Sequence, residues 1–226
     1  MDFRFDIIYE YREMFWTGAK YTLGLTAFAV AVGTVLGLVG ALCRLANFEK
    51  GNIVLRTLGW FLRTVSLLYV TLFRGTPLFV QIFIWHFIWS VALINPTDGW
   101  IISGELAREL RKEYGALIAG ALALSTNAGA YITEIFRAGI QSIDRGQVEA
   151  ARSLGLNYEQ AMRHVILPQA TRRMLPPFGN EFITLLKDSS LVSAIGVAEL
   201  AYVARTVSGR FSIYEEPLYT IALIYL

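Results

Sequence analysis

The sequence has 226 residues, of which 55% are hydrophobic and only 17% are charged, and its formal net charge is +2. Globular domains carry about 25% charged residues, so this composition excludes an ordinary soluble domain, and the small net charge argues against a nucleic-acid-binding protein. The single cysteine, Cys43, excludes an internal disulfide and a multi-cysteine metal site. Three long uncharged stretches, 21–43, 77–96 and 116–133, account for the low charge. Each approaches the roughly 20 apolar residues that a helix needs to cross a bilayer, so we predict an all-α integral membrane protein.

The first half of the chain is predicted to begin with residues 1–15, an amphipathic, aromatic-rich segment that lies in the membrane interface. The first span follows at about 16–43, and its Gly33, Gly37 and Gly40 form a stripe suited to close helix packing. Residues 53–76 are apolar but interrupted by arginines, which predicts a helix that starts at the membrane surface and enters the bilayer near its end.

The remaining predicted elements are the second span at 77–94, a loop, and the third span at 116–136. A fourth apolar stretch, 175–197, follows a polar segment and is itself broken by polar residues. A last loop leads to 218–226, the start of a fifth span. Nine helical residues cover only about 14 Å, so the fifth span is expected to be truncated. The prediction is one polytopic transmembrane permease-type domain over 1–226 with about five spans.

The predicted orientation follows from the distribution of basic residues, because Lys and Arg concentrate in cytoplasmic loops. The segments between spans 1 and 2 and between spans 3 and 4 hold ten such residues, against five in the other two loops. The ten are Arg44, Lys50, Arg56, Arg63, Arg137, Arg145, Arg152, Arg163, Arg172 and Arg173, and the five are Arg108, Arg111, Lys112, Arg205 and Arg210. We therefore predict that the N-terminus lies outside and that residues 144–168 lie in the cytoplasm.

Residues 144–168 predict two short helices joined by a turn, an arrangement that we call the elbow. Asp144 is a candidate N-cap, with Gln147 completing a capping box. Gly155 is suited to a left-handed turn. The capping pattern repeats at 157–160, and Pro168 is expected to end the second helix.

The elbow resembles the "EAA" loop of bacterial ABC importer permeases, in its Glu-Ala-Ala at 149–151, its glycine six residues after Glu149 and its Leu-Pro at 167–168. Val165 stands where the family usually has isoleucine. Three further segments, 73–81, 130–140 and 179–196, resemble the polar amino acid branch of that family, which includes permeases for histidine, glutamine, glutamate and arginine.

The resemblance implies an ATP-driven importer in the bacterial inner membrane, with no cofactor and no catalytic residue on this chain. Its implied partners are two cytoplasmic ABC ATPase subunits, a second permease subunit, identical or homologous, a periplasmic or lipid-anchored solute-binding protein, a polar amino acid substrate and membrane lipid. The coupling residues that it implies are Glu149, Ala150, Ala151, Gly155, Leu167 and Pro168. The chain contains no Gly-x-x-x-x-Gly-Lys-Ser/Thr phosphate loop, so ATP hydrolysis is expected on a separate subunit.

Polar residues in the fourth span are the candidate substrate site, since ionisable groups within a membrane are costly and usually functional. A zwitterionic amino acid needs both signs of charge, so Lys187 is a candidate for the carboxylate, and Glu181 and Asp188 for the ammonium or a polar side chain. The alternative is that Lys187 pairs internally with one of these acids. The full candidate set is Asn180, Glu181, Thr184, Lys187, Asp188, Ser189 and Ser190.

Other polar residues are interpreted structurally. His86 has no partner at metal or catalytic spacing and is predicted to be packed or pore-lining, while Arg74 and Arg137 are read as interface anchors or phosphate-facing charges. Two rival classes stay open: a secondary transporter or channel working without an ATPase, and a membrane enzyme using Glu181 and Asp188 as acid and base. The first leaves the elbow unexplained, and the second lacks a metal cluster or a nucleophile.

Overall fold

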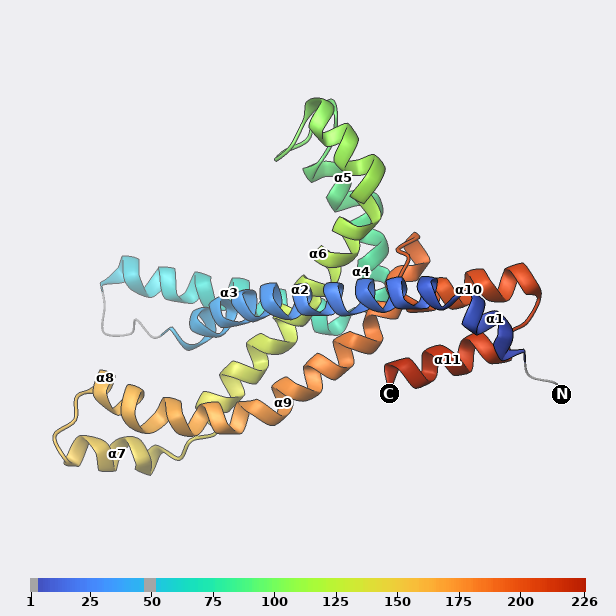
Figure 1. Cartoon of the computed structure of the whole chain (residues 1–226). Coiled ribbons are helices and arrows are strands. Elements are labelled where there is room, and N and C mark those ends of the chain that lie inside the picture. The colour runs from blue at the N-terminus through green and yellow to red at the C-terminus, as the bar shows by residue number, and fades with distance from the viewer. Residues whose placement is uncertain (1–3, 47–51) are drawn as a thin grey trace. The chain divides into compact units, whose positions relative to one another are not determined.

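A computed structural model of the chain describes residues 4–46 and 52–226 and is helical throughout these ranges, apart from turns and one isolated bridge between Ile94 and Ile102 (Figure 1). The chain divides into two compact units that share the long helices. Unit 1 holds the chain up to Ala31 together with Thr76–Ser125 and Thr184–Leu226, and unit 2 holds Val32–Gly75 and Thr126–Ile183.

Three helices are long and apolar enough to cross a bilayer: α2 (Arg12–Leu45), α3 (Ile53–Gly75) and α6 (Gly104–Gln141). A bent pair, Tyr158–Ile195 with α10 (Leu200–Phe211), adds a fourth if the pair forms one span. The all-α transmembrane fold is therefore confirmed, while the number of spans and the orientation stay predictions.

Relative to the predicted elements, α3 is a continuous helix of 23 residues and is by itself long enough to span. The expected second span is shorter. It consists of α4 (Leu78–Ile84), a π-helical turn η1 (Trp85–Trp89) and α5 (Ser90–Leu93).

Two predicted loops are partly wrong. The loop expected over 95–115 is confined to 95–103, because α6 already begins at Gly104. The loop expected after 197 contains α10, followed by α11 (Glu215–Tyr225). The start of α10 is capped by Glu199, which is fully buried and accepts hydrogen bonds from the backbone N–H groups of Ala201 (2.9 Å) and Tyr202 (2.8 Å). Glutamate is not a favoured N-cap residue, so the sequence alone did not indicate this start.

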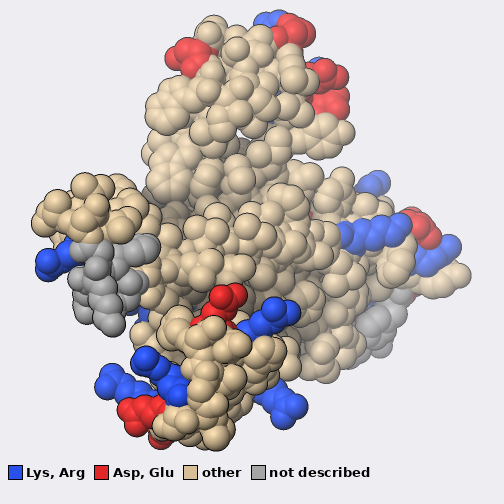
Figure 2. Space-filling model, turned by 90° about the vertical axis from the view of Figure 1, so that its left-hand side faces the viewer, with Lys and Arg blue, Asp and Glu red and all other residues tan. Residues whose placement is uncertain are grey.

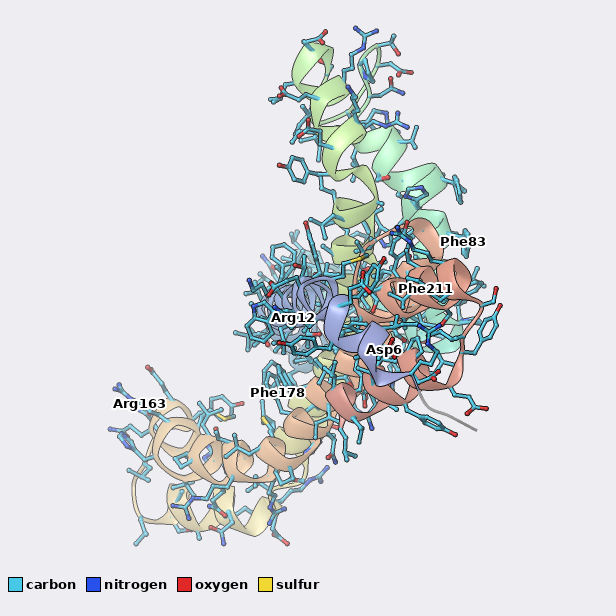
Figure 3. All side chains as sticks on the ribbon, turned by 45° about the vertical axis from the view of Figure 1, so that its right-hand side comes forward. Asp6, Arg12, Phe83, Arg163, Phe178 and Phe211 are labelled. Carbon is cyan, nitrogen blue, oxygen red and sulfur yellow. The ribbon has the colours of Figure 1, made fainter. Side chains whose placement is uncertain are left out.

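The core of unit 1 joins the N-terminal segment to α10 and α11. Residues 1–15 contain α1 (Phe5–Glu10) and the start of α2, and Ile7 and Phe15 are buried in a cluster with α10 residues. The Tyr11 ring packs edge-on against Phe211 at 5.4 Å between centroids, near the rim that Figure 3 marks with Arg12 and Phe211. The backbone N–H of Arg4 donates to Glu216 Oε1 at 2.7 Å. These contacts hold the first helix against the last.

Unit 2 packs α2, α3 and α6 closely because small residues meet. A Cβ added at Gly37 or at Gly40 would overlap the side chains of Ile132 and Thr133 on α6, respectively. The Ser66 hydroxyl of α3 donates to the Gly40 carbonyl at 2.9 Å. The predicted packing role of the glycine stripe is thus confirmed at these two positions.

Candidate functional site

The elbow consists of α7 (Arg145–Ser153), α8 (Tyr158–Ala161), a π-helical turn η2 (Met162–Ile166) and the start of α9 (Leu167–Asp188). Asp144 caps α7 as predicted, since its Oδ1 accepts from the Gly146 N–H at 2.6 Å. The partner expected for the capping box behaves differently: Gln147 Oε1 accepts from Gln169 Nε2 at 3.4 Å, which joins the two arms of the elbow.

The turn of the elbow is a Schellman motif centred on Gly155, whose φ is +86°. The Gly155 N–H donates to the Arg152 carbonyl at 3.0 Å, and the Leu156 N–H donates to the Ala151 carbonyl at 3.1 Å. These two bonds satisfy carbonyls that the end of a helix would otherwise leave unpaired. The left-handed turn predicted at Gly155 is confirmed.

The second arm begins as predicted but does not end where expected. Asn157 and Gln160 form the complete capping box. Pro168 was expected to stop this helix, and that prediction is wrong, because η2 leads directly into α9. Proline cannot donate to the carbonyl four residues earlier and its ring crowds that position. The wider π turn immediately before Pro168 accommodates both defects, so the elbow is continuous with the long helix α9.

The elbow has its own small core. Ile143, Ile166, Ala170 and Met174 are buried together, with Val165 packed against them. Of the predicted coupling residues, Ala151 is buried inside the elbow, at 4% exposed. Glu149, Ala150, Gly155, Leu167 and Pro168 all lie on its surface.

The elbow surface also exposes large apolar side chains that the sequence analysis missed. Leu154 is 85% exposed and Tyr158 is 68% exposed, on either side of the Gly155 turn. Charged side chains surround the elbow, in the lower lobe of Figure 2, and Arg163 points outward in Figure 3. Exposed apolar groups within a polar rim are typical of protein-docking surfaces. The available signal was that apolar residues flank a turn glycine outside any apolar run.

The candidate substrate residues all lie on one run of helix, formed by α9 and the 3₁₀ helix η3 (Ser189–Ile195). Asn180, Thr184 and Lys187 are exposed, Glu181, Asp188 and Ser190 are half-buried, and Ser189 is buried. The Ser189 hydroxyl donates to the Leu186 carbonyl at 2.7 Å. Among the described residues Lys187 forms no ion pair, so the internal pairing considered for it is absent there.

A charge cluster in unit 2 is a further feature that the sequence analysis missed. Glu134 Oε1 lies 3.2 Å from Arg44 Nη1, and its Oε2 lies 2.6 Å from Arg137 Nη2. The Glu134 side chain is only 16% exposed. Arg137 also donates to Gln141 Oε1. Arg137 is thus an ion-pair partner, in place of the interface anchor that was expected. The i, i+3 spacing of an acid and a base within a predicted span was the available signal.

Arg74, the other expected anchor, lies at the end of α3. Its guanidinium stacks 5.1 Å from the centroid of the Tyr131 ring of α6, a cation–π geometry. Tyr69 and Asn127 reinforce the same helix pair, since the Tyr69 hydroxyl donates to the Thr126 carbonyl at 2.6 Å and Asn127 Nδ2 donates to the Phe73 carbonyl at 3.3 Å. The end of α3 is therefore fixed to α6.

Comparison with known proteins identifies the family. Residues 33–226 match the family described as "Binding-protein-dependent transport system inner membrane component". The chain is 34% identical to the glutamine transport system permease protein GlnP of Escherichia coli over 95% of this chain and 86% of that protein. It is 36% identical to the arginine transport system permease protein ArgU of Corynebacterium glutamicum over 88% of this chain, but it spans only 58% of that relative.

Solved structures agree with the sequence relatives. A crystal structure of an amino acid ABC transporter with histidines aligns with a TM-score of 0.76 and 37% identity, covering 100% of this chain and 92% of that chain. An inward-facing MetNI methionine ABC transporter aligns with a TM-score of 0.67 over 95% of this chain and 88% of that chain, and at 23% identity it shows the shared fold alone. The chain belongs to the family of inner membrane components of binding-protein-dependent transport systems and is a multi-pass permease subunit.

Proposed function

We propose that this chain is the pathway-forming subunit of an ATP-driven importer for a polar amino acid, and that the elbow is the surface through which ATPase movement reaches the membrane helices. The observation that carries the coupling role is the elbow itself. It is a separately capped structure with its own core, and it is continuous with α9 through η2. A force applied to the elbow therefore acts directly on the helix that carries the candidate substrate residues.

The docking partner proposed for the elbow is a separate ABC ATPase. Leu154 and Tyr158 supply apolar contact area, and Glu149 supplies a negative charge for a basic group on the partner. Ala150 is exposed and small, so that a partner surface can approach α7 closely. Aromatic residues surrounded by a polar rim commonly dominate binding energy at protein interfaces. ATP hydrolysis is assigned to that subunit.

A matched pair of substitutions tests this assignment. Tyr158→Glu places a charge at the centre of the proposed interface, whereas Tyr214→Glu places one at a similarly exposed tyrosine (64%) between α10 and α11. We expect Tyr158→Glu to abolish ATPase co-purification and amino acid uptake at an unchanged membrane level, with Tyr214→Glu behaving as wild type. Uptake that persists in the Tyr158 variant without bound ATPase would instead favour a secondary transporter.

For the substrate, we propose that Lys187 contacts the carboxylate and that Glu181 and Asp188 contact the ammonium or the side chain. The relatives named for glutamine and arginine support a polar amino acid. The exposed Lys187 without an ion pair among the described residues supports a charge reserved for a ligand. Asn180, Thr184, Ser189 and Ser190 supply neutral hydrogen-bonding groups on the same helical run.

The remaining partners of the proposed complex follow from the family description, which names a binding-protein-dependent system. We propose a solute-binding protein, periplasmic or lipid-anchored, that delivers the amino acid, and a second permease subunit that completes the pathway. Two ATPases would then dock on two elbows. Co-purification of the complex, followed by determination of its subunit composition, tests the stoichiometry.

A further inference from the structure

A cavity of about 210 Å³ in unit 1 lies between the end of the 78–93 segment and the start of α6. Its polar lining comes from His86, Ser90 and Arg111, and its apolar lining includes Phe87, Val91 and Ile94. None of these residues belongs to the elbow or to the polar run of α9. Phe83, one turn before His86 on the same segment, is labelled in Figure 3.

The polar groups of this cavity have unused hydrogen-bonding capacity. His86 Nδ1 is buried and finds no hydrogen-bond partner among the described residues. Arg111 forms no ion pair within those residues either, and its side chain is exposed enough to adjust. Ser90 is already engaged, because its hydroxyl donates to the His86 carbonyl at 3.1 Å. A buried polar atom without a partner costs about 1–3 kcal/mol, so a ligand that accepts hydrogen bonds here would recover stability.

The backbone positions His86 through an irregular turn. Residues Trp85–Trp89 form the π-helical turn η1, in which the His86 ring packs edge-on against Phe87 at 4.7 Å. Such turns interrupt an α-helix at some cost and frequently occur at functional sites. This chain contains no proline at η1, in contrast to η2, where Pro168 accounts for the widened turn.

The surroundings of the cavity identify the ligand class. Trp85 and Trp89 pack edge-on at 5.0 Å, and Trp89 is 41% exposed. Phe87 and Ile88 are 62% and 59% exposed on the same turn. Tryptophan collects at the level of lipid headgroups, and exposed apolar groups beside it suit acyl chains. A cationic Arg111 at that level faces the phosphate layer of the membrane.

We propose that His86 and Arg111 bind an oxyanion, the phosphate of a membrane phospholipid, whose apolar part lies against Phe87 and Ile88. Arg111 donates to the phosphate oxygens, and His86 donates through Nδ1–H. The lipid fixes the end of the 78–93 segment against α6. This site is separate from the substrate and coupling residues and does not depend on their assignment.

The test uses the intact purified transporter complex and phosphatidylglycerol, with lipid retention measured by native mass spectrometry. Arg111→Gln and His86→Phe remove the two proposed donors. Lys112→Gln is the matched control, because it removes a neighbouring positive charge of α6 that does not line the cavity. Loss of a hydrogen bond to a charged group predicts an affinity reduced about tenfold in each donor variant. The control is expected to match wild type.

Competition experiments distinguish the source of the oxyanion. Inorganic phosphate and the free amino acid substrates are added separately at millimolar concentration, and neither is expected to displace phosphatidylglycerol. Equal losses of lipid in Arg111→Gln and Lys112→Gln would overturn the proposal, because the binding would then reflect net charge alone. Displacement by inorganic phosphate or by amino acid would also overturn it, since the site would then bind a soluble anion.

Discussion

Two groups of charged residues within the helices differ in how their charges are satisfied. Glu134 holds Arg44 and Arg137 at ion-pair distance, and all three side chains are at most 27% exposed. Lys187, near the end of α9, is exposed and forms no ion pair among the described residues. Removing one member of a buried pair leaves an uncompensated charge, whereas removing an unpaired charge leaves the protein intact. The first arrangement therefore indicates stability, and the second leaves Lys187 available to a ligand.

The elbow supplies a third case, in which few charges but many backbone hydrogen bonds are satisfied locally. Its caps, its Schellman turn and its core lie within a short stretch of sequence. Disturbing it should therefore impair communication with a partner more than the folding of the membrane helices. Four experiments separate these roles, in order of decreasing expected effect.

The largest effect is an all-or-none difference in labelling. Single cysteines introduced at Asp98, Arg210 and Gln147, in a Cys43→Ser background, report which residues face the outside of intact cells. The predicted orientation requires a membrane-impermeant thiol reagent to label positions 98 and 210 but not 147. Labelling of position 147 without permeabilisation would place the elbow outside and remove its proposed contact with an ATPase.

The next effect concerns stability in the Glu134 cluster. Glu134→Gln leaves Arg44 and Arg137 without their shared counter-charge, and we expect a loss of about 3 kcal/mol in the free energy of unfolding. Thermal unfolding of the detergent-solubilised protein measures it. Glu105→Gln is the control, because its pair with Arg108 is 3.5 Å long and its side chain is 82% exposed. That substitution should change stability by less than about 1 kcal/mol. Equal effects of the two substitutions would contradict the structural role of Glu134.

A smaller effect is expected at the turn of the elbow. Gly155→Ala adds a Cβ that meets no atom within 4 Å, so its cost arises from the left-handed backbone alone, about 1–2 kcal/mol. We expect reduced ATPase co-purification and reduced uptake at a normal membrane level. Gly209→Ala on α10 also adds a methyl group in open space, but without a positive φ, and should be silent. Unchanged ATPase association in the Gly155 variant would count against the turn as the element that sets the elbow geometry.

The smallest effect on the protein itself is expected at Lys187. Lys187→Ala should leave thermal stability unchanged because no ion pair is lost among the described residues. It should raise the amino acid concentration for half-maximal uptake about tenfold, the effect of losing one hydrogen bond to a charged group. Lys187→Arg, which keeps the charge, should recover part of the affinity. Uptake at wild-type concentrations in Lys187→Ala would remove this residue from the substrate site.

The sequence by itself determined the features that depend on composition and on neighbouring residues. Uncharged stretches predicted the membrane helices, because a bilayer requires a minimum apolar length. The Asp144 cap, the Asn157–Gln160 box and the Gly155 turn were predicted because each is formed within a few residues. The family followed from motif residues that occur in order along the chain.

Only the tertiary structure decided which distant groups meet. The pairing of Arg44 with Glu134, the burial of Ala151 and the capping of α10 by Glu199 each depend on packing that no local pattern specifies. Pro168 shows the same limit, since its helix-breaking tendency was overridden by a π turn that keeps η2 continuous with α9. Local hydrogen bonds and apolar length can be read from neighbours in the sequence, whereas ion pairs and close packing require helices that the chain brings together only on folding.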